Sequence, residues 1–210
     1  MQDDWDRLRS ALRAEGVTGV EDLDRFVNNT KHLAPSRFDS RAAMPVLLRL
    51  LPTLTDRKAV EATARHLHGA WARPSAFDAL EEAFRTWAPH DALVAWTIGD
   101  SLALAATFDD LDVLLDFAEN RQYGQARQMI VYSLWRFGKD LRVVDAIRRL
   151  TEDPDVCLHA MTALRRAVGN EAAMLQLCRV RDEHPDQNVR KQAARAVKNA
   201  QRSLVRHQYP

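Results

Sequence analysis

The stretch "KDLRVVDAIRRLTEDPDVCLHAMTALRRAVG", residues 139–169, indicates the fold of this chain. It contains two amphipathic segments, "LRVVDAIRRL" and "VCLHAMTAL", in which apolar residues recur three and four positions apart. This spacing is typical of α-helices that bury one side. Asp153 and Pro154 lie between the segments, where a carboxylate is expected to cap the second helix and a proline suits its first turn. The stretch therefore predicts two helices joined by a short turn.

The second segment of this pair has counterparts along the chain. Five nine-residue stretches align, and they are "AVEATARHL" from Ala59, "VAWTIGDSL" from Val94, "ARQMIVYSL" from Ala126, "VCLHAMTAL" from Val156 and "VRKQAARAV" from Val189. Their starts are 35, 32, 30 and 33 residues apart, and another amphipathic segment precedes each one. If the first residue is position 0, then positions 0, 4, 7 and 8 are expected to face inward. Two helices per period indicate a helical solenoid.

The glycines, prolines and capping residues agree with this division into helix pairs. Gly138 and Gly169 follow second helices, where a left-handed residue is expected. Ser75 is expected to cap the helix "AFDALEEAF", and Pro45 to lie in the opening turn of the first helix of the first pair.

The bulk composition excludes several classes of protein. The 210 residues are 46% hydrophobic and 28% charged, with a formal net charge of +1, as in ordinary globular proteins. Glycines and prolines are few and alternating β-branched runs are absent, so the chain is predicted to be all-α. No apolar run has membrane-spanning length, and the acidic start "MQDDWDRLRS" does not resemble a signal peptide.

The chemistry-bearing residues predict no metal or cofactor. Cys157 and Cys178 are the two cysteines, and neither belongs to a CxxC or Cys/His cluster. His66 and His68 are two apart and face different sides of a helix, so they cannot chelate together. The chain has no P-loop, GxGxxG or GxSxG motif. We therefore expect a cytoplasmic protein with reduced thiols, without metal, cofactor or membrane span.

Residues 139–169 and "HPDQNVRKQAARAVKNA", residues 184–200, resemble HEAT repeats of the short bacterial type. The spacing, the Asp-Pro junction and the V-x-x-x-A-x-x-A-L core carry the resemblance, which covers roughly residues 40–206. It implies a right-handed α-solenoid of about five helix pairs within residues 39–210. The pairs are expected at about 40–69, 73–107, 108–138, 139–169 and 170–206. Residues 1–38 do not fit the repeat, and two short helices at 3–16 and 20–29 followed by a linker are expected to form an N-terminal helical cap.

Positions 2, 6 and 9 of each second helix lie opposite the inward positions, so they predict an exposed surface. In HEAT-like solenoids second helices commonly line the concave side. The residues predicted there to bind a partner are Trp96, Asp100, Gln128, Tyr132, Trp135, Arg165, Lys191, Arg195 and Lys198. Ala103 is placed on the same surface. The second pair permits two registers, with Val94 or His90 at position 0, and Trp96 faces outward in both. Packing of Trp96 and Trp135 against an adjacent helix or the cap is the competing interpretation.

This surface favours a non-catalytic scaffold that binds a protein or peptide. Aromatic residues and arginine dominate binding hot spots, so Trp96, Tyr132 and Trp135 are the expected anchors. The last helix adds a basic row, made of Lys191, Arg195, Lys198, Arg202 and Arg206. We expect this row to attract an acidic or phosphorylated partner, with solvation of an end helix as the competing interpretation.

Nucleic acid is the alternative partner, because basic residues and aromatics together suit a phosphate backbone and unstacked bases. The sequence pI of about 7.9 is low for a dedicated nucleic-acid binder. Trp96 and Asp100, one turn apart and followed by Arg127, are similar to the arrangement in HEAT-like bacterial alkylpurine DNA glycosylases. That resemblance implies that Asp100 stabilises positive charge or activates water, while Trp96 contacts the lesion sugar. W-x-x-x-D is a short and common pattern, so the sequence favours a protein without catalysis.

Overall fold

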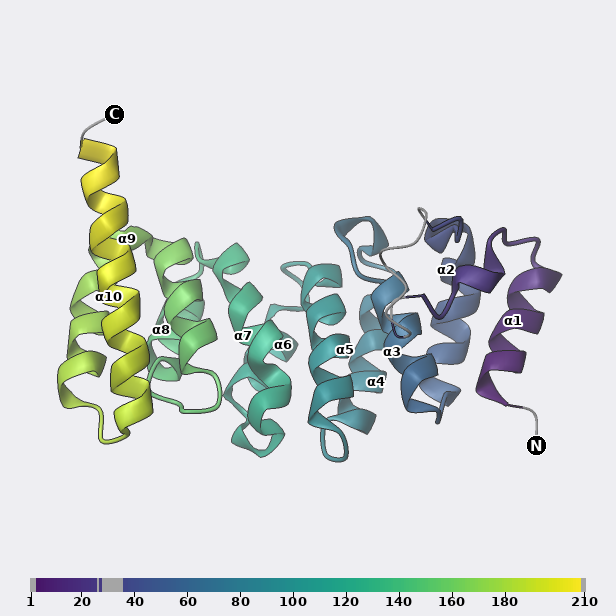
Figure 1. Cartoon of the computed structure of the whole chain (residues 1–210), viewed down its shortest axis with the longest axis horizontal. Coiled ribbons are helices and arrows are strands. Elements are labelled where there is room, and N and C mark those ends of the chain that lie inside the picture. Colours follow the sequence, from purple (N-terminus) through teal and green to yellow (C-terminus); the bar gives the residue numbers. More distant parts are fainter. Residues whose placement is uncertain (1–2, 26, 28–35, 209–210) are drawn as a thin grey trace. The chain divides into compact units, whose positions relative to one another are not determined.

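In the computed structural model, which describes residues 3–25, 27 and 36–208, the chain forms ten α-helices and five 3-10 helices (Figure 1). Over these residues there is no strand, which confirms the predicted all-α class. The chain divides into two compact units, Met1–Thr107 and Phe108–Pro210. We call them the N-terminal and the C-terminal unit, and each buries apolar residues from its own helices.

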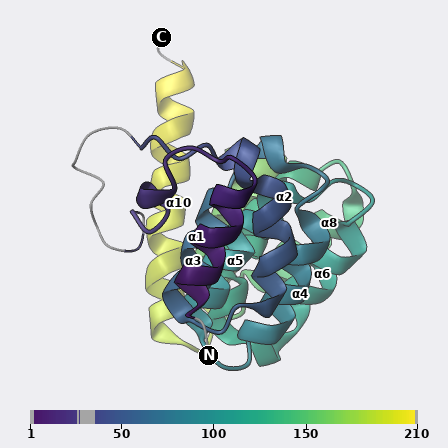
Figure 2. The same ribbon diagram turned by 90° about the vertical axis from the view of Figure 1, so that its right-hand side faces the viewer.

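The N-terminal unit is built from five α-helices. They are α1 (Asp4–Ala14), α2 (Ser40–Leu50), α3 (Arg57–His66), α4 (Phe77–Trp87) and α5 (Ala92–Ala105), with 3-10 helices η1 (Val20–Asp22), η2 (Leu51–Thr53) and η3 (Ala70–Ala72) between them. Helix α5 packs against α3 and α4, and α1 packs against α2. Figures 1 and 2 both show α1 lying beside α2.

The N-terminal segment is attached to the helix pair that follows it through a buried carboxylate. Asp4, on α1, accepts hydrogen bonds from the backbone N–H groups of Thr55 and Asp56, at 2.6 and 2.7 Å. These two residues form the turn between α2 and α3, so α1 is fixed to that turn. Helix α1 confirms the first predicted short helix. In place of the second there is only η1, and residues 26 and 28–35 lie outside the described part of the chain.

The C-terminal unit contains the other five α-helices. They are α6 (Leu111–Glu119), α7 (Gln128–Ser133), α8 (Leu141–Leu150), α9 (Cys157–Glu183) and α10 (Gln187–Gln208), with η4 (Arg121–Arg127) before α7 and η5 (Leu134–Phe137) after it. Helix α9 packs against α7, α8 and α10. Gly169 interrupts α9, so residues 157–168 and 170–183 form two successive helical stretches. Each of the five predicted segments thus contains two helical stretches.

The two glycines predicted to end helices have different physical roles. Gly169 has a φ of 84°, which confirms the expected positive value and explains the break in α9. Gly138 has a φ of −63°, so its prediction as a left-handed residue is wrong. A Cβ atom at Gly138 would lie 2.9 Å from the Cβ of Ala167. Glycine is therefore required at 138 because α9 approaches closely.

Several predicted helix starts are also wrong in detail. Ser75 does not cap α4, because Ala76 is the N-cap residue and no side chain caps this helix. Pro45 lies inside α2 beyond its opening turn, because Asp39 caps the helix by accepting hydrogen bonds from two backbone N–H groups. Asp153 does not cap the helix at Cys157, because its carboxylate is bound elsewhere.

Candidate functional site

The inward positions of the second helices are buried in all five predicted pairs, which confirms the periodicity argument. Positions 0, 4, 7 and 8 hold Ala59, Thr63, His66 and Leu67, then Val94, Ile98, Ser101 and Leu102, then Ala126, Ile130, Ser133 and Leu134, then Val156, Ala160, Ala163 and Leu164, then Val189, Ala193, Ala196 and Val197. The opposite positions are half-buried or exposed, with one exception. Ala103 is fully buried, so its placement on the outer surface is wrong. The apolar helix α5 buries residues on more than one side.

An exposed cluster of two aromatic rings and an arginine lies on the C-terminal unit. The Arg166 guanidinium lies 4.8 Å from the centroid of the Tyr132 ring and 5.2 Å from that of the Trp135 ring. Trp135 is 37% exposed, Arg166 is exposed and Tyr132 is half-buried. Both distances are within the range of a cation–π interaction. We call Tyr132, Trp135 and Arg166 the aromatic–arginine cluster.

Local sequence places the two rings together, and a neighbouring helix supplies the cation. Tyr132 and Trp135 are three residues apart on a continuous helical stretch, where α7 passes into η5, so their side chains share one side. Arg166 comes from α9, which packs against both elements. His159, also on α9, contacts the edge of the Tyr132 ring, with centroids 6.4 Å apart. Burial lowers the pKa of His159, so this ring adds no positive charge at neutral pH.

The chemistry of the cluster suits a polar, partly apolar ligand. Within the described residues Arg166 has no ion pair or hydrogen bond, so its N–H donors remain free for a carboxylate or a carbonyl. The rings hold the guanidinium in place, which lowers the entropic cost of using it. Leu158, on the same stretch of α9, is 47% exposed. Trp, Tyr and Arg are the residue types that contribute most to protein interfaces.

The predicted neighbours Gln128 and Arg165 have internal partners. The Gln128 side-chain amide donates to the backbone carbonyl of Asp155 at 2.8 Å, and the Arg165 Nε donates to Asn170 Oδ1 at 2.8 Å. Both side chains are half-buried. Gln128 therefore joins the start of α7 to the turn before α9, and Arg165 is bound across the break at Gly169.

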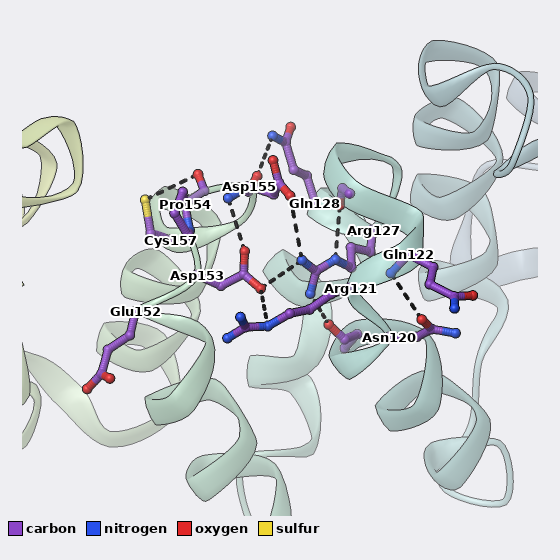
Figure 3. Close-up of polar contacts among 12 residues, drawn as sticks. Asn120, Arg121, Gln122, Arg127, Gln128, Glu152, Asp153, Pro154, Asp155 and Cys157 are labelled. Carbon is purple, nitrogen blue, oxygen red and sulfur yellow. Dashed lines mark hydrogen bonds and ion pairs between the residues drawn. The ribbon is translucent and has the colours of Figure 1, made fainter. Parts of the chain in front are cut away.

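Arg127 lies in a buried ion pair rather than at an exposed site. Figure 3 shows its guanidinium directed at Asp153, whose Oδ2 accepts from Nη2 at 2.8 Å. The same guanidinium donates to the carbonyls of Ala118 and Gly124, at 2.8 and 3.0 Å, and it has no exposed surface. Arg121, 79% exposed, approaches the same Asp153 oxygen at 3.5 Å. Arg127 thus joins the turn before α7 to the turn before α9, and because it is fully buried it cannot contact a DNA phosphate.

One predicted residue of the N-terminal unit, Asp100, is paired with a histidine. Asp100, on α5, lies 3.1 Å from the Nε2 of His68, and both side chains are partly exposed. The hydrogen bond to Asp100 raises the pKa of His68, against a smaller opposing effect of burial. Trp96, one turn before Asp100, is half-buried. Asp100 is therefore hydrogen-bonded to His68, a contact that the sequence did not predict.

The three predicted cations of α10 are all exposed. Lys191, Arg195 and Lys198 have no ion-pair or hydrogen-bond partner for their side chains in the described part of the chain. They lie opposite the buried residues of the same helix, as the helical spacing predicts.

Comparison with protein-family models, with curated proteins and with solved structures finds no match for this chain. Among the described residues no three His, Cys, Asp or Glu side chains form a group that could hold a metal ion. None of the helices in this part of the chain combines the length and apolar character needed to cross a lipid bilayer.

Arg166 belongs to the aromatic–arginine cluster but was not among the residues predicted to bind a partner. It is one position beyond the last outward position of its nine-residue stretch, and only the approach of α9 to α7 brings it to Tyr132 and Trp135. The available signal was an arginine directly after Arg165, on the second helix of the pair that follows the Tyr-x-x-Trp sequence.

Proposed function

We propose that this chain is a non-catalytic, HEAT-like repeat protein that binds a protein partner through the outer side of its second helices. The aromatic–arginine cluster of Tyr132, Trp135 and Arg166 is the main anchor. The five helix pairs and the regular burial of positions 0, 4, 7 and 8 support a repeat protein. In such arrays function resides in the exposed side chains and differs between members of one fold.

The observation that carries the proposal is the exposure of a tryptophan beside an arginine that has no carboxylate partner among the described residues. Exposed tryptophan is unfavourable in water, and a partner that covers Trp135 would remove apolar surface from solvent. The same partner can accept hydrogen bonds from Arg166. An apolar contact and a charge-assisted hydrogen bond at one place are typical of an interface hot spot.

Affinity capture with a matched control tests the proposal. Native protein and the variant Trp135→Ala/Arg166→Ala are used as baits, and captured proteins are quantified by mass spectrometry. Leu175→Ala is the control, because Leu175 is an 84% exposed apolar residue on α9 outside the cluster. We expect at least one partner that is bound by the native protein and the control but lost with the double variant. Identical partners for all three baits would refute the proposal.

Direct binding measurements with the captured partner then give the contribution of the aromatic–arginine cluster to the affinity. We expect the double variant to weaken binding by at least about a hundredfold, as for removal of a hot-spot pair. Thermal unfolding monitored by circular dichroism must show that the variant remains folded. Equal affinity of a folded double variant would show that the partner binds elsewhere.

A further inference from the structure

A row of cations without partners runs along the exposed side of α10. Its members are Lys191, Arg195, Lys198 and Arg202. All four are exposed, and in the described residues none of their side chains has an ion pair or a hydrogen bond. Arg206 continues the row in the sequence, but its side chain lies outside the described residues. We call these four residues the α10 cation row.

The row differs from the arginines of α8 and of the second stretch of α9. Every arginine on α8 and on the second stretch of α9 has a carboxylate partner. Arg149, for example, lies 2.6 Å from Glu119, and Arg179 lies 3.1 Å from Glu152. Helix α10 has six Lys or Arg residues and no Asp or Glu at all. Like charges one turn apart repel one another. No carboxylate on α10 offsets this repulsion within the row.

Helical geometry makes the row one continuous ridge. Successive members are four, three and four residues apart, so they share one side of the helix. At 100° per residue this side lies about 180° from the buried Val189, Ala193 and Ala200, which face the rest of the unit. At a rise of 1.5 Å per residue the row extends over roughly 17 Å. Figure 1 shows α10 as the yellow helix packed beside α9.

We propose that the α10 cation row is a docking surface for an acidic helical segment of a partner protein. Carboxylates at the same four, three, four spacing on such a segment would face the four cations in turn. A phosphate backbone needs a basic surface that continues across several elements. Here the arginines on α8 and the second stretch of α9 are already paired with carboxylates, so the row does not continue onto these helices as unpaired charge, and its length suits a short acidic segment.

This docking surface lies on the outer side of the last second helix, so the inference rests on the proposed function for that side of the helix, but the surface shares no residue with the aromatic–arginine cluster. The partner is attracted by charge, and the affinity therefore depends on salt. Binding at this ridge requires neither Trp135 nor Arg166.

Synthetic peptides test the inference on the full-length protein. The probe is a helical peptide of about 16 residues, roughly 24 Å long, with Glu at the four matching positions, and its control carries Gln there. Fluorescence anisotropy should show binding of the Glu peptide only. Raising the salt from about 50 to about 300 mM should weaken binding, because screening shortens the range of exposed charges.

A matched pair of variants locates the site. Lys191→Gln/Arg195→Gln/Lys198→Gln should weaken binding of the Glu peptide by about tenfold, since three exposed ion pairs together are worth roughly that factor. The control Arg142→Gln/Arg148→Gln/Arg149→Gln removes the same charge from α8, where carboxylates already compensate it. This control should bind nearly as the native protein does.

Three results would overturn the inference. They are equal binding of the Gln peptide, equal loss in both triple variants, and tighter binding of an oligothymidine of similar length, which would make the ridge a nucleic-acid surface. Self-association that only the α10 variant abolishes, measured by sedimentation, would show that a second copy of this chain is the occupant and would also overturn it. Trp135→Ala/Arg166→Ala should leave peptide binding unchanged, so failure here is distinct from failure of the proposed function.

Discussion

Breaking the buried ion pair between Arg127 and Asp153 should destabilise the C-terminal unit strongly. Arg127 is fully buried and Asp153 is 3% exposed, so removing either partner leaves the other charge away from water without its main counter-ion. Such a loss costs about 3–5 kcal/mol of unfolding free energy. We expect Asp153→Asn to lie near the lower value, because Arg127 would keep its bonds to two backbone carbonyls. Arg127→Met should cost at least as much, because those carbonyls lose their donor as well.

The control for this prediction is Arg121→Met. Arg121 approaches the same Asp153 oxygen at 3.5 Å but is 79% exposed, and solvent screens such a pair. We therefore expect a loss within about 0.5 kcal/mol for this variant. The double variant Arg127→Met/Asp153→Asn should cost less than the sum of the two single variants, because both act on one interaction.

Urea unfolding followed by tryptophan fluorescence measures these effects. The chain has five tryptophans, and Trp135 is the one within the C-terminal unit. Hydrogen exchange of peptides from this unit gives a second measurement that the tryptophans of the N-terminal unit do not influence. A loss below about 1 kcal/mol for Arg127→Met, or equal losses for Arg127→Met and Arg121→Met, would refute the reasoning, because burial would then carry no added cost.

Three further predictions concern protonation and close packing. Burial lowers the pKa of His66 to about 4, so the neutral form stabilises the fold above pH 6.5 and this contribution is lost as the pH falls from 6.5 toward 4. This contribution is about 3 kcal/mol. As the pH falls from 6.5 toward 4, the urea midpoint of the native protein should therefore decrease more than that of His66→Gln. Parallel curves for the two proteins would contradict this. Asp100→Asn should lower the pKa of His68 in an NMR titration, since the Asp100 hydrogen bond is the main cause of its raised value; an unchanged titration would argue against that bond. Gly138→Ala should cost about 1–3 kcal/mol through overpacking against Ala167, and a combined Ala167→Gly substitution should recover part of the loss if the contact is the cause.

Periodicity in the sequence was enough to predict the helices of the five pairs and the inward side of each second helix. Apolar residues three and four positions apart lie on one side of any α-helix, so burial of positions such as Val94 and Ile98 follows from local geometry. The prediction was wrong for Ala103, because a mostly apolar helix such as α5 gives weak information on which side is exposed. Helix ends were also predicted less well, as at Ser75 and Gly138, since packing of neighbouring elements decides them.

The sequence by itself determined the all-α class, the buried helical positions and the exposure of the cations on α10. These properties depend on residues within one helix, where spacing fixes direction. Only the tertiary structure decided which distant side chains meet. Arg127 and Asp153 are 26 residues apart, and Arg166 is more than 30 residues from both Tyr132 and Trp135. Such contacts depend on how adjacent helices are aligned and how closely they approach, which the local periodicity does not specify.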